Sequence, residues 1–186
     1  MDEHTFPAAD ADRLDDAARR YRTLSAEELY GAVDPEAGDA VVDLGSGTGF
    51  YTDELTPHVA EVAAVDVQPA MHDRYREKGV PENVTLVTAG ADDLPFADDR
   101  FAAAVSTMTL HELPEAAVTE AARVLRSGGR FVVVDWTAEG RGERGPPLAE
   151  RTTADEAAAL FREAGFEVTA QATRAETFLL VGVLGE

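Results

Sequence analysis

The sequence contains no cysteine, and its only lysine is Lys78. Without thiols the chain has no disulfide, no thiolate metal ligand and no cysteine nucleophile. Long hydrophobic runs are also missing, since the longest strongly apolar stretch covers residues 178–184 and is far too short to span a bilayer. Residues 1–16 are acidic and polar, which is unlike a signal peptide. These absences predict a soluble, cytoplasmic protein that does not enter membranes.

Positive charge is scarce, with 16 Lys and Arg against 36 Asp and Glu and a net charge of −20. This balance excludes broad electrostatic attraction to nucleic acids or anionic membranes, so neither is expected as a partner. The acidic residues occur along most of the chain, and nearly all basic residues are arginine. This pattern indicates adaptation to a salt-rich cytoplasm, where counterions screen self-repulsion, although an acidic face for a cationic partner is an alternative. The four histidines are scattered, so no metal site is predicted.

The length of 186 residues suits a single domain, spanning residues 1–186. Residues 1–36 form a helical preface, with helices expected over 10–21 and 25–33. The second of these starts at Ser25, which has capping-box spacing to Glu28. Residues 37–186 then alternate strand and helix patterns, which predicts a mainly parallel sheet with helices on both faces.

The expected strands are mostly continuous apolar or β-branched runs, as in strands buried on both faces. The short turn at Arg174 and Ala175 predicts that the last two strands form an antiparallel hairpin. Residues 126–129 are expected to form a break before the fifth strand. The expected strands cover 40–44, 62–67, 84–88, 101–106, 130–136, 167–173 and 176–184, and the helices of this part cover 50–55, 69–78, 115–125 and 153–164.

The first of these strands runs into the segment Asp43-Leu44-Gly45-Ser46-Gly47-Thr48-Gly49. A glycine-rich turn between a buried strand and a helix can cradle a small ligand, because glycine permits close backbone approach. A dinucleotide fingerprint needs a glycine where Phe50 stands, which disfavours a nicotinamide-dependent oxidoreductase, and a P-loop needs a lysine that is absent. A turn that binds no ligand is the remaining alternative from the residues alone.

The segment from Asp43 to Gly49 resembles the first motif, D-x-G-x-G-x-G, of class I S-adenosylmethionine-dependent methyltransferases, and the motif is complete. The stretch from Ser106 to Leu113 is similar to the H-x-L element of the branch that includes the ubiquinone and menaquinone biosynthesis methyltransferases. This resemblance implies S-adenosyl-L-methionine as cofactor and a Rossmann-like α/β sheet of seven strands closed by an antiparallel hairpin. It also implies methyl transfer to a small-molecule acceptor.

In such a sheet ligands bind beyond the carboxyl ends of the strands. Asp66 ends the second strand, where a carboxylate can accept two hydrogen bonds from ribose hydroxyls. By resemblance, the glycine turn and Asp43 hold the methionine part, Met71 packs on the adenine or fills the core, and Asp92, or else Asp93, binds the adenine amine. The expected cofactor-binding residues are Asp43, Gly45, Ser46, Gly47, Gly49, Asp66, Val67, Met71, Asp92 and Thr107.

His111 is the candidate general base, because its unperturbed pKa lies near neutrality. A structural histidine that caps the next helix or orders its loop is the alternative. The family's second acid at the entry to the fourth strand is replaced by Ala102, so its contribution is missing. Trp136 and the loop over 140–147 follow the fifth strand, and the indole either lines an acceptor wall or closes the core.

Two hypotheses therefore follow from the sequence. The first is a methyltransferase acting on a small molecule. The second is a regulatory or scaffold module that binds S-adenosyl-L-methionine without transferring its methyl group, which would leave His111 and the proline-containing loop unexplained.

Overall fold

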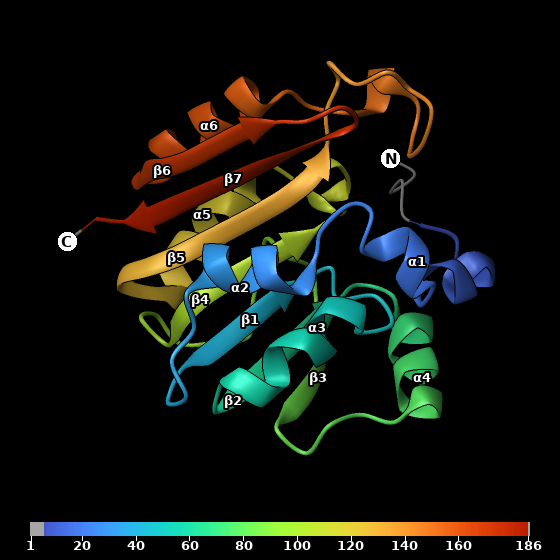
Figure 1. Cartoon of the computed structure of the whole chain (residues 1–186). Coiled ribbons are helices and arrows are strands. Elements are labelled where there is room, and N and C mark those ends of the chain that lie inside the picture. The colour runs from blue at the N-terminus through green and yellow to red at the C-terminus, as the bar shows by residue number, and fades with distance from the viewer. Residues whose placement is uncertain (1–5, 186) are drawn as a thin grey trace.

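The computed structural model describes residues 6–185, which are arranged around one seven-stranded sheet (Figure 1). The strand order is β3-β2-β1-β4-β5-β7-β6. Only β7 runs antiparallel to its neighbours β5 and β6, which confirms the predicted sheet with its C-terminal hairpin. The strands are β1 (Ala40–Leu44), β2 (Glu61–Asp66), β3 (Val84–Thr88), β4 (Phe101–Thr107), β5 (Leu125–Trp136), β6 (Phe166–Thr173) and β7 (Thr177–Leu184).

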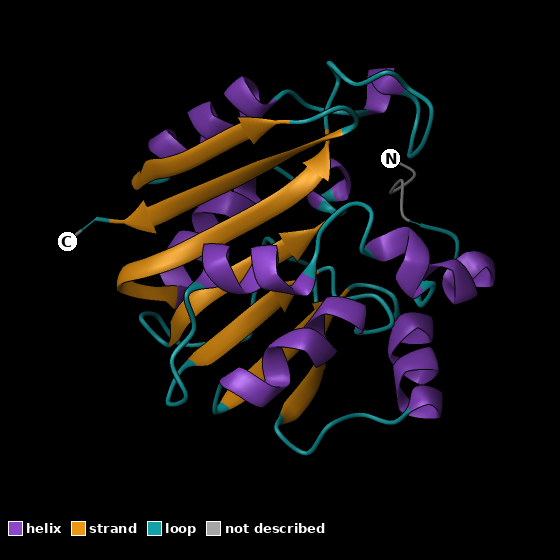
Figure 2. Ribbon diagram, in the orientation of Figure 1, coloured by secondary structure: helices purple, strands orange, loops and turns teal. Residues whose placement is uncertain are grey.

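Helices cover both faces of the sheet (Figure 2). Helices α2 and α3 contribute to one buried apolar cluster, and α5 and α6 contribute to the cluster on the opposite face. The α-helices are α1 (Ala17–Arg20), α2 (Ala26–Val33), α3 (Phe50–Leu55), α4 (Pro69–Lys78), α5 (Ala116–Val124) and α6 (Ala154–Glu163). Short 3-10 turns occur at η1 (Ala8–Leu14), η2 (Thr56–His58), η3 (Leu110–Glu112) and η4 (Leu148–Glu150).

The central strands are mainly apolar because both of their faces are buried. In β1, Val41 joins the cluster with α2 and α3, whereas Val42 and Leu44 join the cluster with α5 and α6. All three side chains are fully buried. This two-sided burial is the physical reason that the strands could be predicted from continuous apolar runs.

The N-terminal preface differs from the prediction of one helix over 10–21. It forms the 3-10 turn η1 and then the four-residue helix α1. Asp16 separates them, since its side chain accepts a hydrogen bond from the backbone of Arg19 and caps α1. Ser25 caps α2 in the same way through the backbone of Glu28, but the Glu28 carboxylate pairs with Arg174 instead of completing a capping box.

Strand β5 begins at Leu125, five residues before the predicted start at Arg130. The predicted break over 126–129 therefore lies inside the strand. Leu125 pairs with Phe101, the register then shifts, and Arg130 pairs with Ala103. Gly128, with φ of 74°, supplies the left-handed conformation within this irregular segment. The glycines thus mark an irregularity of the strand and not its boundary.

Strand β1 lies between β2 and β4. The chain adds β2 and β3 on one side of β1 and then returns to add β4 on the other side. The crevice outside the carboxyl ends of strands at such a switch point is where open α/β sheets bind ligands. Within residues 6–185, no helix is both long and apolar enough to cross a bilayer.

Candidate active site

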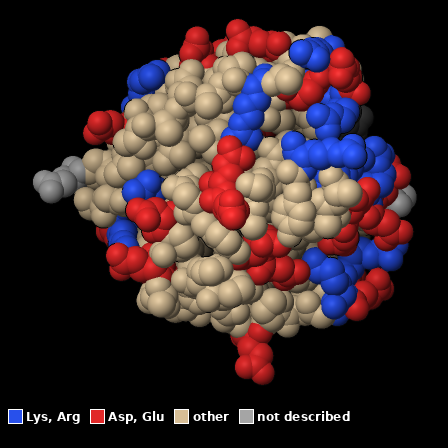
Figure 3. Space-filling model, in the orientation of Figure 1, with Lys and Arg blue, Asp and Glu red and all other residues tan. Residues whose placement is uncertain are grey.

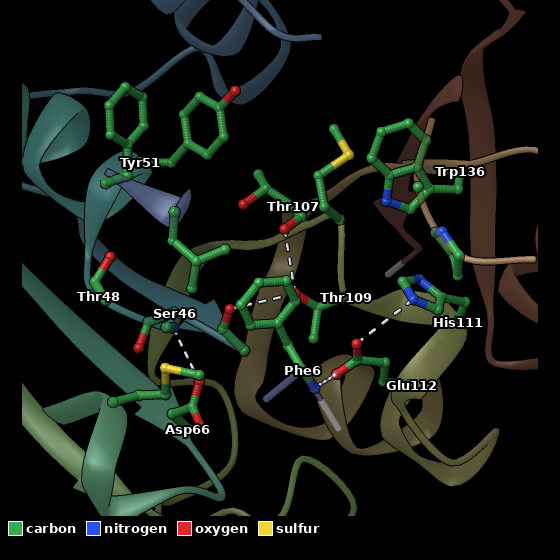
Figure 4. Close-up of a pocket in the computed structure, with 18 of the residues that line it drawn as sticks. Phe6, Ser46, Thr48, Tyr51, Asp66, Thr107, Thr109, His111, Glu112 and Trp136 are labelled. Atoms are coloured by element: carbon green, nitrogen blue, oxygen red, sulfur yellow. Dashed lines mark hydrogen bonds and ion pairs between the residues drawn. The ribbon is translucent and has the colours of Figure 1, made fainter. Parts of the chain in front are cut away.

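A cavity of about 780 Å³ lies at the carboxyl ends of the central strands. Figure 4 shows side chains from β2, β4, β5 and the glycine turn around it. Two further segments complete the wall, the N-terminal residues from Phe6 onward and the loop that precedes η4. Among the predicted site residues, Gly45, Ser46, Gly47, Asp66, Val67, Met71, Asp92, Thr107 and His111 line the cavity. Asp43 and Gly49 lie outside this lining.

The glycine turn is shaped by close packing and by left-handed backbone conformations. Gly45 has φ of 74°, and a Cβ there would lie 2.2 Å from Cγ2 of Thr109. Gly49 has φ of 81°, and a Cβ there would lie 2.1 Å from the Tyr75 ring. Both positions therefore exclude other residues. Gly45 adjoins the cavity, whereas Gly49 packs against the Tyr75 ring at the start of α3.

Asp43 lies beneath the glycine turn and is fully buried. Its Oδ2 accepts a hydrogen bond of 2.6 Å from the Thr52 hydroxyl, while its Oδ1 has no hydrogen-bond partner among the described residues. Burial raises the pKa of this carboxyl to about 6. Ser46 Oγ is also buried without a partner. Buried polar atoms are normally hydrogen-bonded, and Ser46 lines the cavity, so its hydroxyl is available to a polar ligand there.

Asp66 ends β2 and faces the cavity beside the glycine turn (Figure 4). Its Oδ2 accepts from the backbone N–H of Gly47 at 2.9 Å, and its Oδ1 accepts from that of Gln68 at 2.8 Å. Burial raises the pKa of Asp66 above its ordinary value, although these hydrogen bonds oppose the rise. Each oxygen keeps acceptor capacity, so the carboxylate can still bind the two hydroxyls of a ribose.

The residues predicted for the adenine lie next along the wall. Met71 is buried on α4 and also lines the cavity, so core packing and ligand contact are combined in one side chain. Asp92 lines the cavity, whereas its neighbour Asp93 does not. The structure therefore favours Asp92 between the two candidates.

His111 forms a pair with Asp135, a residue that the sequence analysis missed. Nδ1 of the imidazole lies 2.9 Å from Oδ1 of Asp135, and because a carboxylate only accepts, Nδ1 carries the proton. The backbone N–H of His111 donates to Oδ2 of the same carboxylate at 2.6 Å. Asp135 is fully buried near the end of β5. Asp66 was predicted from its position at the end of a strand. The same reasoning could have identified Asp135, which lies next to the end of β5.

Glu112 is the second carboxylate beside His111, with its Oε1 3.6 Å from Nε2 (Figure 4). Burial by itself lowers the pKa of His111, but hydrogen bonds with Asp135 and Glu112 outweigh that effect and raise the pKa to about 9. His111 is therefore mainly protonated at neutral pH. The imidazole can accept a proton only after Nε2 has lost one. Its activity as a base therefore depends on the pH and on the charge of Glu112.

The N-terminal segment crosses the cavity, which the sequence analysis did not anticipate. The Phe6 backbone N–H donates to Oε2 of Glu112 at 3.2 Å, and the Phe6 carbonyl accepts from Nε2 of Gln68 at 3.0 Å. Leu14 packs against the glycine turn, since a Cβ on Gly47 would lie 3.2 Å from its Cδ1. Phe6 and Leu14 are apolar residues within a polar segment, and this feature of the sequence could have indicated that the segment packs against the rest of the protein.

The end of β4 turns sharply into the cavity. Met108 has φ of 62°, an uncommon conformation for a residue with a side chain, and its N–H donates to Val134 at 2.7 Å. The hydroxyl of Thr109 lies 3.3 Å from the Gly45 carbonyl and 3.2 Å from that of Thr107. These bonds tie the β4 turn to the glycine turn, so Thr107 is held in the wall of the cavity (Figure 4).

The loop that follows β5 forms the outer wall. Glu143, Arg144, Gly145, Pro146 and Pro147 line the cavity together with Trp136. A Cβ on Gly145 would lie 2.5 Å from the Trp136 indole, so the loop packs directly on this ring. Trp136 is therefore part of the cavity wall, as one of the two sequence alternatives predicted.

Arg151 fixes this loop from behind. Its side chain is 1% exposed and forms an ion pair of 3.1 Å with Glu176. Its Nε donates to the Pro146 carbonyl at 2.9 Å, and Nη2 donates to that of Arg144. Glu176 in turn accepts from the backbone of Gly142 and Glu143. One buried ion pair thus sets the conformation of the outer wall.

The strand order, the acidic residue near the end of β1, the glycine turn that follows it and the acid that ends β2 together define the class I methyltransferase architecture. Comparison with known proteins agrees with this class. Residues 42–133 match the methyltransferase domain family. A S-adenosylmethionine-dependent methyltransferase from Aquifex aeolicus superposes with a TM-score of 0.87 at 26% identity, over 97% of this chain and 100% of that one.

Two curated relatives are similar over the central part of the chain. The ubiquinone/menaquinone biosynthesis C-methyltransferase UbiE of Allorhizobium ampelinum is 32% identical over 60% of this chain and 47% of its own length. The demethylmenaquinone methyltransferase of Corynebacterium kroppenstedtii is 37% identical over 56% of this chain and 45% of its own. The chain thus spans about half the length of these relatives. The fold, the matched domain and these relatives are those of class I S-adenosylmethionine-dependent methyltransferases, and they imply S-adenosyl-L-methionine as the cofactor.

Proposed function

We propose that the protein transfers the methyl group of S-adenosyl-L-methionine to a small molecule held between His111 and Trp136. The observation that carries this proposal is the continuity of one cavity. The glycine turn and Asp66 lie along the same wall as the His111–Asp135 pair and the outer loop. A site built only to bind the cofactor gives no reason for an imidazole paired with a buried carboxylate at its far end.

The bound cofactor supplies an electrophilic methyl group on its sulfonium. The residues of the chain bind the acceptor in line with that group and exclude water. Asp135 orients the imidazole through Nδ1, which leaves Nε2 to accept a proton from an acceptor hydroxyl once His111 is neutral. Glu112 pairs with Nε2 and so competes with the acceptor for this position.

The acceptor that fits best is a hydroxylated aromatic ring. The cavity lining includes apolar surface and a planar indole, beside the charged Glu143 and Arg144 of the outer loop. The apolar residues are Met108, Leu113, Trp136, Pro146 and Pro147. The names of the quinone-pathway relatives support the same class of acceptor. Removal of a proton from a ring hydroxyl would make the adjoining oxygen or ring carbon nucleophilic, which is the task that an imidazole can perform.

The test is methyl transfer to a panel of quinols, catechols, phenols and amines, followed by the mass of the product and the release of S-adenosylhomocysteine. We expect transfer to hydroxylated aromatic acceptors. His111→Ala should lower turnover by about 100-fold or more, while S-adenosylhomocysteine still binds. The matched control is His58→Ala, because His58 is exposed on η2 away from the cavity.

Two outcomes would contradict the proposal. Cofactor binding without transfer to any acceptor of the panel would favour the module that binds without catalysis. Equal turnover by His111→Ala and the unaltered protein would remove the imidazole from the reaction.

A further inference from the structure

The basic side chains of this acidic chain divide into two groups by their ion pairing. Ten of the 16 form an ion pair with a carboxylate. The other six have no such partner among residues 6–185, although acidic residues outnumber basic ones by more than two to one. These six are Arg19, Arg20, Arg22, Arg141, Arg144 and Arg162.

The unpaired arginines are concentrated at the cavity. Of the ten paired side chains only Arg13 lines it, whereas four of the six unpaired ones do, namely Arg19, Arg20, Arg22 and Arg144. Figure 3 shows basic side chains gathered in the region where Figure 1 places α1 and the loop before η4. A chain with a net charge of −20 repels anions in general, so unpaired cations gathered around one cavity indicate a ligand that carries negative charge.

The acidic residues of the lining do not neutralise these arginines. Asp10 pairs with Arg13, and Asp16 accepts from the backbone at the start of α1. Glu143 precedes Arg144 in the chain, yet the two side chains form no ion pair, and the Arg144 side chain has no hydrogen-bond partner within residues 6–185. The guanidinium of Arg144 is therefore available to a ligand.

Arg144 belongs to the part of the cavity wall that surrounds the proposed acceptor. Its backbone carbonyl accepts a hydrogen bond from Nη2 of Arg151, which fixes the loop at this residue. The next residue, Gly145, packs on the Trp136 indole, since a Cβ there would lie 2.5 Å from the ring. Figure 4 shows Trp136 and His111 at the same end of the cavity. An aromatic acceptor on this indole would thus have a cationic group beside it.

We propose that the methyl acceptor carries an oxyanion, a carboxylate or a phosphate, which Arg144 binds while the aromatic ring packs on Trp136. This site rests on the proposed transfer to a hydroxylated aromatic ring and narrows the class of acceptor. The planar guanidinium presents paired donors that match either oxyanion. Arg19 and Arg22 add positive potential at the same cavity, which favours an anionic acceptor over a neutral one despite the net charge of the chain.

Calorimetry on the protein saturated with S-adenosylhomocysteine tests the oxyanion site without requiring turnover. Saturation occupies the cofactor site, so the carboxylate of the cofactor does not compete with the probes. The probes are 3,4-dihydroxybenzoate and 3,4-dihydroxyphenylphosphonate, and 3,4-dihydroxybenzamide is the neutral counterpart. We expect at least one oxyanion to bind about fivefold or more tightly than the amide, and the tighter of the two identifies the group.

Arg144→Gln should remove this preference. We expect it to weaken the favoured oxyanion by about fivefold or more and to leave the amide and S-adenosylhomocysteine within about twofold. Arg141→Gln is the matched control, because Arg141 is an exposed and unpaired arginine of the same loop that does not line the cavity. It should keep the preference for the oxyanion.

Several results would overturn the oxyanion site. They are binding of the amide as tight as that of both oxyanions, no binding of any probe, a preference that persists in Arg144→Gln, and an equal loss in Arg141→Gln. Weaker binding of S-adenosylhomocysteine by Arg144→Gln would assign this arginine to the cofactor instead. Methylation of neutral phenols with no gain from an oxyanion would refute this site alone, whereas oxyanion binding through Arg144 without methyl transfer to any acceptor would refute the proposed function and retain the site.

Discussion

His111 lies between the carboxylates of Asp135 and Glu112, and their charges decide when the imidazole can act as a base. With a pKa of about 9, neutral His111 becomes abundant only as the pH rises through that value. We therefore expect kcat/KM to increase with pH and to level off above about 9. Glu112→Gln removes one of the two charges that favour the imidazolium. The increase should then occur about one pH unit lower.

The pH–rate profile of each variant provides the measurement. Glu115→Gln is the matched control, because Glu115 is exposed at the start of α5 and does not line the cavity. It should leave the profile in place. A Glu112→Gln profile that coincides with the unaltered one would show that Glu112 does not control the basic group, and a profile that falls with pH would exclude His111 as base.

Individual residues could be predicted where their chemistry follows from position alone. Asp66 and His111 were identified because they follow strands, where ligands bind in this type of sheet. Glu112 directly follows His111, but the sequence could not indicate that its carboxylate would lie 3.6 Å from Nε2 of the imidazole. Asp43 was identified, but the sequence could not indicate that one of its oxygens would lack a partner.

Among the structural elements, the loop between β5 and η4 depends most on a single contact. Arg151 and Glu176 are buried, and together they bond to backbone groups along the loop that lines the outer cavity. Arg151→Met removes the donors but keeps much of the side-chain volume. We expect kcat/KM for the acceptor to fall by about 10- to 100-fold because the wall loses its fixed position. Affinity for S-adenosylhomocysteine should change little, since this loop adjoins the opposite end.

Kinetics with the acceptor and calorimetry with S-adenosylhomocysteine separate these effects. Arg141→Met is the control, because Arg141 is an exposed residue of the same loop and does not line the cavity. Thermal unfolding of both variants shows whether the fold persists. Normal acceptor kinetics in a folded Arg151→Met variant would mean that the wall does not depend on the buried ion pair.

The strands and most helices could be predicted because the pattern of apolar and polar residues in their sequences indicates which side chains are buried. Helices α3 and α4 have the predicted bounds, and α6 (Ala154–Glu163) is one residue shorter at each end than the predicted helix over 153–164, with Thr153 as its N-cap. The preface could not be predicted in detail. Its conformation depends on a cap at Asp16 and on contacts with the glycine turn, neither of which appears in a helical pattern. The start of β5 was missed because tertiary pairing with Phe101 overrides the local preference of a glycine pair.

The charge of the whole molecule is its most unusual global property. A net charge of −20 on 186 residues produces strong self-repulsion in the folded state at low ionic strength. On the face shown in Figure 3, acidic side chains lie in scattered groups, with basic side chains among them. This scattered distribution agrees better with adaptation to salt than with a single acidic surface for a cationic partner. Salt should then stabilise the fold by screening.

We expect the melting temperature to rise steeply between about 20 mM and about 0.5 M KCl and to flatten above that, because the Debye length falls to a few ångströms. A variant with Glu82→Gln, Glu163→Gln and Glu167→Gln should melt higher than the unaltered protein at low salt. All three residues are exposed and form no ion pair within residues 6–185. At high salt the two curves should converge, since screening makes the removed charges irrelevant. A melting temperature independent of KCl, or an equal difference between the two proteins at every concentration, would contradict the electrostatic origin.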